Sequence, residues 1–84
     1  MYYYEMTISG TKYDVSAMIP EEGDEFDFPA EKLPELESAA RRAMFATLQR
    51  VQAENPEAEF EGWRAVRPDG SVVREGDTLT VEVS

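Results

Sequence analysis

The sequence predicts a single α+β domain spanning residues 1–84, in which one long amphipathic helix packs on one face of a mainly antiparallel sheet of four or five strands. Two short segments of alternating polarity come first, on either side of Ser9-Gly10. A stretch of about 21 residues with helical periodicity follows, and further alternating segments come after it. The predicted order is therefore β-β-α-β-β, and a helix on one sheet face closes such a core.

The first two strands form a predicted hairpin. Residues 2–9 alternate, and we expect one set of side chains to face the core: Tyr2, Tyr4, Met6 and Ile8. Residues 11–19 alternate in the same way, with one face made of Thr11, Tyr13, Val15, Ala17 and Ile19. Two strands around a short glycine turn are typical of a β-hairpin.

The helix is predicted to begin near Pro29 or Pro34, because proline suits a first helical position, and to end at Asn55-Pro56. Apolar residues recur there every three or four positions and form one stripe: Leu33, Leu36, Ala40, Ala43, Met44, Leu48 and Val51. On the polar side, Glu37 and Arg41 are spaced for an intrahelical ion pair.

Three segments after the helix are predicted to be strands. Residues 60–67 come first, and Gly62 marks an expected bulge because Phe60 and Trp63 are out of phase. Residues 67–70, Arg-Pro-Asp-Gly, have the composition of a β-turn, and residues 71–74 form the next expected strand. Residues 75–77 are expected to turn, and residues 78–83 alternate again.

The hairpin residues 6–12, the helix and residues 76–81 together resemble the ubiquitin-like β-grasp pattern. The resemblance implies a sheet containing a parallel strand pair, as an alternative to a wholly antiparallel sheet. Conjugated modifiers of that family end in two glycines, whereas this chain ends in Val83-Ser84, so we do not expect conjugation.

Composition removes several classes of function. There is no cysteine and no histidine, so neither a thiolate metal site nor a nucleophile paired with histidine can form. The formal charge is 8 − 18 = −10, which disfavours direct binding to nucleic acid or anionic membranes. We therefore expect no enzyme activity and no cofactor. The absence of cysteine, of a secretory signal and of a spanning apolar run favours the cytoplasm.

Acidic residues are concentrated in two places. Residues 21–37 hold eight acids against Lys32, a net of 8 − 1 = 7 negative charges, and Glu54, Glu57, Glu59 and Glu61 follow the helix without an intervening base. Grouped carboxylates accept arginine hydrogen bonds and steer association, so we expect a protein partner with a basic surface. The expected contact residues are Glu21, Glu22, Asp24, Glu25, Phe26, Asp27, Glu57, Glu59, Glu61 and Tyr3.

In size, charge and element order the chain resembles phage-encoded inhibitors such as anti-CRISPR proteins and DNA mimics, which occlude nucleic-acid-binding sites on host proteins. The resemblance implies an inhibitor that covers such a basic groove. The alternative is a structural or assembly protein, a small homo-oligomer held through its sheet and aromatic residues, among them Tyr3 and Trp63. The sequence leaves both a monomer and a small homo-oligomer open.

Overall fold

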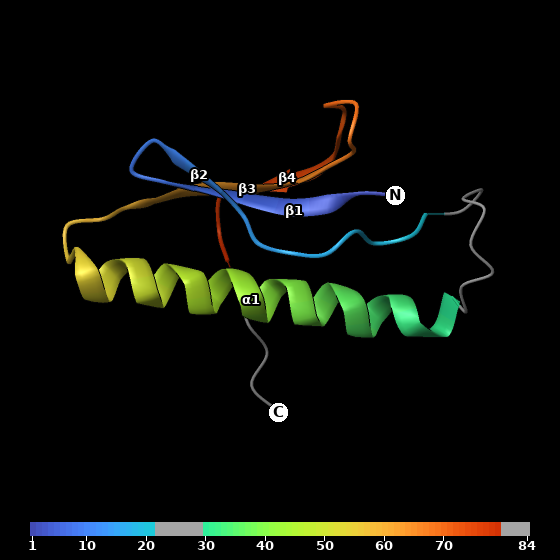
Figure 1. Cartoon of the computed structure of the whole chain (residues 1–84), viewed down its shortest axis with the longest axis horizontal. Coiled ribbons are helices and arrows are strands. Elements are labelled where there is room, and N and C mark those ends of the chain that lie inside the picture. Colours follow the sequence, from blue (N-terminus) through green and yellow to red (C-terminus); the bar gives the residue numbers. More distant parts are fainter. Residues whose placement is uncertain (22–29, 80–84) are drawn as a thin grey trace.

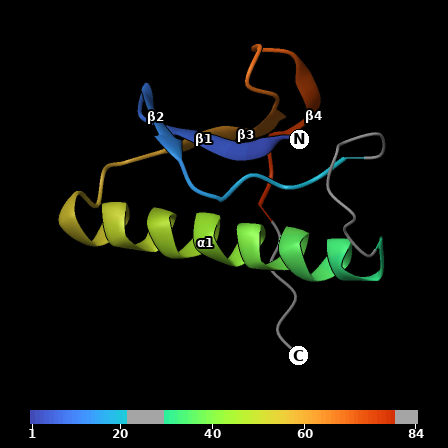
Figure 2. The same ribbon diagram turned by 45° about the vertical axis from the view of Figure 1, so that its right-hand side comes forward.

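The computed structural model describes residues 1–21 and 30–79 of the chain and confirms the predicted α+β fold. One helix, α1, lies along one face of a four-stranded sheet, so the molecule has two layers (Figures 1 and 2). The sheet order is β2-β1-β3-β4, and every neighbouring pair is antiparallel. The strands span Tyr3–Ile8 (β1), Thr11–Asp14 (β2), Phe60–Val66 (β3) and Val72–Gly76 (β4).

The second strand is shorter than predicted because a side chain takes over part of the ladder. β2 pairs with β1 only as far as Glu5 and Asp14. Beyond that point the backbone N–H of Tyr4 donates to Oγ of Ser16 at 2.7 Å. The chain returns to the ladder at Ile19, which bridges Tyr2. Strand β2 therefore ends at Asp14, and the alternation predicted over residues 11–19 holds only in part.

Of the two strands after the helix, β3 pairs with β1 of the hairpin and β4 pairs with β3, and neither has a parallel partner among the described residues. β1 lies between β2 and β3, so the central pair is antiparallel and not the parallel pair of the β-grasp arrangement. The predicted bulge is confirmed, since the β1–β3 register shifts next to Gly62. Strand β4 continues to Gly76, where a turn was predicted. The strand expected over residues 78–83 falls mostly outside the described residues.

Helix α1 spans Leu33–Glu54 and follows a short 3-10 turn, Ala30–Lys32. Pro34 lies in the first turn, where its missing N–H leaves no intrahelical hydrogen bond unmade. The end of the helix is capped by the backbone N–H of Asn55, which donates to the carbonyl of Val51 at 2.8 Å. Both boundaries agree with the sequence prediction. The 22 residues give a length of roughly 33 Å at 1.5 Å per residue.

The core lies between the helix and the sheet. The four residues predicted to face inward from the first strand are all buried: Tyr2, Tyr4, Met6 and Ile8. The helix contributes Ala40 and Met44 as its buried residues, and Met44 is 0% exposed. Leu33, Leu36, Leu48 and Val51 pack around them half-buried, so the predicted apolar stripe is the contact face of α1.

A polar network joins the two layers beside this core. The Tyr2 hydroxyl and the Arg74 guanidinium both donate to Oε1 of Glu37 on α1, each at 2.7 Å. Arg74 also donates to the Tyr4 hydroxyl at 2.6 Å and lies over the Tyr2 ring. Glu37 is therefore bonded to the sheet and not to Arg41, the intrahelical partner that the sequence suggested. The network ties β1 and β4 to the helix.

The end of β4 is shaped by the contact between Trp63 and Gly76, which are paired directly across β3 and β4. A Cβ atom on Gly76 would lie 2.8 Å from three atoms of the Trp63 indole, so only glycine leaves room for the ring. The indole N–H donates to the carbonyl of Thr78 at 2.8 Å, and the ring packs against Tyr4. Trp63 therefore holds the chain where it leaves β4.

We expect Gly76→Ala to destabilise the protein by about 1–3 kcal/mol, because the added methyl group must displace the indole and break its hydrogen bond. Urea unfolding followed by tryptophan fluorescence measures the change. Glu75→Ala is the matched control on the same strand, with an exposed side chain and an expected change within about 0.5 kcal/mol. Equal stabilities of the two variants would contradict the role assigned to Trp63.

Candidate protein-interaction surface

The sheet face that points away from α1 carries polar side chains. Because residues alternate along a strand, the neighbours of the buried residues of β1 point outward here: Tyr3, Glu5 and Thr7. Arg64 of β3 lies opposite Glu5, and its Nη2 donates to Oε1 of Glu5 at 2.7 Å. Glu5 is only 8% exposed, so this ion pair is the partly buried centre of the face.

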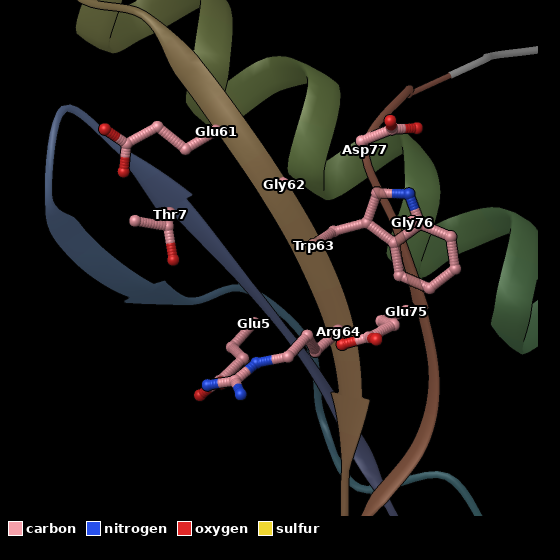
Figure 3. Close-up of a pocket in the computed structure, with 9 residues that line it drawn as sticks. All are labelled: Glu5, Thr7, Glu61, Gly62, Trp63, Arg64, Glu75, Gly76 and Asp77. Atoms are coloured by element: carbon pink, nitrogen blue, oxygen red, sulfur yellow. The ribbon is translucent and has the colours of Figure 1, made fainter.

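A shallow hollow of about 480 Å³ lies on this face. Two of its lining residues, Gly62 and Gly76, have no side chain to fill it. Gly62 has φ +148°, and a Cβ there would lie 3.2 Å from the carbonyl oxygen of Gly76. Figure 3 shows Glu61 and Asp77 on opposite sides of the hollow. Its lining consists of Glu5, Thr7, Glu61, Gly62, Trp63, Arg64, Glu75, Gly76 and Asp77.

The hollow is negatively charged. Its lining holds four carboxylates and one guanidinium, which gives 4 − 1 = 3 net negative charges. Arg64 is bonded to Glu5, and no salt bridge within residues 1–21 and 30–79 neutralises the other three, Glu61, Glu75 and Asp77. These three side chains belong to exposed residues, so their charge acts on whatever approaches the sheet from this side.

The negative surface continues from the hollow toward the end of α1. Glu57 and Glu59 are exposed on either side of buried Ala58, and Glu61 follows two positions later. Ser9 holds this segment, because its N–H donates to the carbonyl of Glu59 and its Oγ accepts from the Glu59 N–H, both at 2.9 Å. We call five of the exposed acids the acidic strip: Glu57, Glu59, Glu61, Glu75 and Asp77.

Glu61 connects the two parts of the acidic strip. It is the extra residue of the β3 bulge, and its Oε2 accepts a hydrogen bond from the Gly10 N–H at 3.1 Å. The turn between β1 and β2 therefore fixes the position of this carboxylate. Of the predicted group Glu57, Glu59 and Glu61, it is Glu61 that lines the hollow together with Glu75 and Asp77, although it is well separated from them in the sequence.

Glu21, the first predicted contact acid, is neutralised within the molecule. Its two carboxylate oxygens accept hydrogen bonds from Nε and Nη2 of Arg67 at 3.0 and 2.9 Å, and the N-terminal amine lies 3.0 Å from Oε2. The hydrogen bonds from Arg67 lower the pKa of this carboxyl, and the N-terminal amine adds to the effect. Glu21 therefore binds the N-terminus to the turn after β3.

The remaining predicted contact residues divide into two groups. Tyr3 lies half-buried on the helix-free face, opposite Val66 of β3, and its part in binding stays a prediction. The acids of the long connection and its phenylalanine lie outside the described residues, and their role stays a prediction as well: Glu22, Asp24, Glu25, Phe26 and Asp27.

Sequence reasoning missed Glu75 and Asp77 as site residues because residues 75–77 have the composition of a turn. The signal that could have placed them is Gly76, the small partner that a tryptophan on a neighbouring strand requires. With Gly76 opposite Trp63, Glu75 becomes a strand residue that points away from the helix. Its position beside Arg64 on the outer face follows from that register.

Two further findings bear on the chemistry of the surface. Within residues 1–21 and 30–79, no three acidic side chains stand close enough together to hold a metal ion. In the same part of the chain, no helix has the length and apolar character needed to cross a membrane. The acids of the strip are thus spread along a surface and do not converge on one point.

Fold and surface together define a two-layer α+β domain with an acidic, solvent-exposed sheet face. Comparison with protein-family models, with curated proteins and with solved structures returns no match for this chain.

Proposed function

We propose that the protein is a small acidic binding module whose acidic strip docks on a basic surface of a partner protein. One observation carries the proposal. The three arginines on the sheet side, Arg64, Arg67 and Arg74, are bonded to Glu5, Glu21 and Glu37. The five carboxylates of the strip are exposed and have no salt bridge among the described residues, so their charge is available to a partner.

The physical basis is electrostatic steering followed by charge-assisted hydrogen bonding. Carboxylates accept two parallel hydrogen bonds from an arginine, which adds orientation to attraction. An excess of one charge on one face raises the association rate with an oppositely charged surface, and salt screens this effect. Because Ser9 holds the backbone of Glu59 and Gly10 holds the carboxylate of Glu61, these two residues lose little conformational freedom when the strip binds.

We further propose that the basic surface is a nucleic-acid-binding groove and that the protein acts as an inhibitor of the DNA-mimic or anti-CRISPR kind. Such grooves present arginine and lysine side chains arranged for phosphates, and spaced carboxylates can occupy the same positions. The alternative, a structural or assembly protein held through its sheet and aromatic residues, has Tyr3 as its half-buried aromatic on the helix-free face. The unpaired acids favour the first function.

Neutralising the strip should slow association with a cationic partner. In the triple variant Glu57→Gln, Glu59→Gln and Asp77→Asn, we expect the association rate with an immobilised oligo-arginine peptide to fall on the order of tenfold at low salt. The salt dependence of the rate should fall with it. Biolayer interferometry over a series of salt concentrations measures both quantities.

A second triple variant of equal net charge tests whether the position of the acids matters or only the total charge of the protein. Glu31→Gln, Glu35→Gln and Asp69→Asn also change the formal charge from −10 to −10 + 3 = −7, but these exposed residues lie at the start of α1 and in the turn between β3 and β4, away from the strip. The proposal expects this control to bind nearly as fast as the original protein. If both triple variants reduce the association rate and its salt dependence by the same factor, the strip has no special role and the proposal is wrong.

A further inference from the structure

The exposed face of α1 differs in charge from the sheet. Residues 38–53 contain no acid and carry Arg41, Arg42 and Arg50, whereas the chain as a whole has a charge of −10. Arg42 and Arg50 are exposed, and within residues 1–21 and 30–79 neither takes part in a salt bridge. Phe45 on the same side is 38% exposed, so an apolar ring lies beside the cations.

The first turns of the same helix carry the opposite charge. Glu31 and Glu35 are exposed, and they too have no salt bridge among the described residues. Glu35 and Arg42 are seven residues apart, which places them on one face two turns from each other. Their backbones are roughly 10 Å apart along the helix axis, and no ion pair joins them. These exposed charges are therefore free to pair with groups of a partner.

We propose that this face of α1 is a self-association surface, on which the α1 helix of a second copy packs antiparallel about a two-fold axis. The axis passes beside Ser38 and Ala39, midway between Glu35 and Arg42. Each Glu35 then lies opposite Arg42 of the second copy, and each Arg42 opposite the second copy's Glu35. One charge pair thus occurs twice, as a two-fold interface requires.

The charges select this register over the one with the longest overlap. If the two helices overlapped over their whole length, Arg42 would lie level with Phe45 of the second copy and within a turn of the second copy's Arg42. Like charges would then meet at the centre, with no acid between residues 38 and 53 to offset them. Shifting the axis toward the helix start replaces that repulsion with two attractive pairs.

The uncharged residues of the face fit a helix partner. Ser38 and Ala39, which lie at the proposed axis, have small side chains, and Ala39 is exposed. Small side chains at the crossing point allow two helices to approach closely. About this axis Leu33 is level with Met44 of the second copy, so the two helices overlap over residues 33–44. The sheet lies on the opposite side of α1, so the acidic strip stays accessible in the pair (Figure 1).

A single helix pair is a small interface, and each copy carries a charge of −10, so the dimer should be weak and should need salt. We expect sedimentation equilibrium at about 100 µM protein and about 0.15 M salt to reveal a monomer–dimer equilibrium. Glu35→Arg alone and Arg42→Glu alone should each weaken dimerisation at least tenfold, since each places like charges opposite one another.

Two rescue experiments test the register. The double variant Glu35→Arg with Arg42→Glu restores both pairs with reversed signs and should dimerise like the original protein. An equimolar mixture of the two single variants should form a heterodimer, because every pair is again of opposite charge. Lys12→Glu on β2 is the matched control for the charge change at Arg42 and should remain dimeric.

A strictly monomeric original protein under these conditions would overturn the inference. So would a dimer that neither single variant weakens, because a different surface would then hold it. Loss of dimerisation in the single variants without recovery in the double variant or in the mixture would overturn the proposed register and, with it, the pairing of Glu35 with Arg42.

Discussion

Met44→Ala should remove a large part of the stability of the protein. Met44 is 0% exposed and is one of the two buried residues that α1 contributes to the core, so its removal leaves a cavity between the layers. Truncating a buried methionine costs about 2–5 kcal/mol, and a domain of this size has about 5 kcal/mol to lose. Urea unfolding followed by circular dichroism should give a midpoint at about half the original value or below.

Met18→Ala is the control for this experiment. Met18 is 46% exposed, so the same chemical change outside the core should alter the free energy of unfolding by no more than about 0.5 kcal/mol. If Met44→Ala were no more destabilising than Met18→Ala, the helix would not be held to the sheet through its buried face.

The second large effect is expected from the network between the layers. Arg74→Gln removes the charge that bonds Glu37 and the Tyr4 hydroxyl, and Glu37→Gln removes the acceptor of both Arg74 and Tyr2. Each should cost about 1–2 kcal/mol, toward the lower part of the range for charged hydrogen bonds because Arg74 is half exposed. The double variant should cost less than the sum, since both changes break one contact.

Arg50→Gln is the control for the loss of an arginine, because Arg50 is exposed on α1 and has no salt bridge among the described residues. It should leave the free energy of unfolding within about 0.5 kcal/mol of the original. Strict additivity of Arg74→Gln and Glu37→Gln would contradict the direct interaction.

The network also makes the free energy of unfolding depend on pH in the acidic range. Burial alone raises the pKa of Glu37, but hydrogen bonds from Tyr2 and Arg74 and the nearby charges of Arg74 and Arg41 outweigh it and lower this pKa. The folded state therefore binds the Glu37 proton less readily than the unfolded state. This stabilisation is fully present above the ordinary carboxyl pKa of about 4.3, and it is lost as the pH falls through the lowered value. The stability difference between the original protein and Glu37→Gln should shrink over that interval.

At alkaline pH the dependence of stability on pH has the opposite direction and comes from Tyr2, whose pKa is raised. Burial raises the pKa of its hydroxyl, and the hydrogen bond to Glu37 and the charge of that carboxylate raise it further. The phenol therefore stabilises the fold below the ordinary tyrosine pKa of about 10, and that stabilisation is lost as the pH rises beyond it. Tyr2→Phe should show a smaller loss of stability above that pH. Identical alkaline profiles for the two proteins would contradict this account.

The fold could be predicted because its signals are local. The alternation of side chains from Tyr2 to Ile8 predicts the buried face of β1. The spacing of apolar residues by three and four positions around Met44 predicts the buried face of α1. Such periodicity follows from backbone geometry alone. The exposed acids Glu57 and Glu59 could be predicted too, since they flank the end of a helix whose boundary is marked by Asn55-Pro56.

The parts that could not be predicted depend on contacts between distant residues. Glu37 and Arg74 are 37 positions apart, and Glu21 and Arg67 are 46 apart, so no local pattern indicates that these acids are already paired. Strand β2 ends where the Ser16 hydroxyl, in place of a backbone carbonyl, accepts the hydrogen bond from the Tyr4 N–H. Which acids stay available therefore follows from the sheet register and could not be read from charge spacing.

The measurement that tests the proposed function most directly is an amide chemical-shift titration of the protein with an oligo-arginine peptide. Because the unpaired carboxylates of the acidic strip extend from the hollow to the end of α1, the largest shifts should fall on Glu57, Glu59, Glu61, Glu75 and Asp77, and on the indole N–H of Trp63 beside the hollow. Shifts spread evenly over all exposed acids, or centred on residues outside the strip, would contradict it.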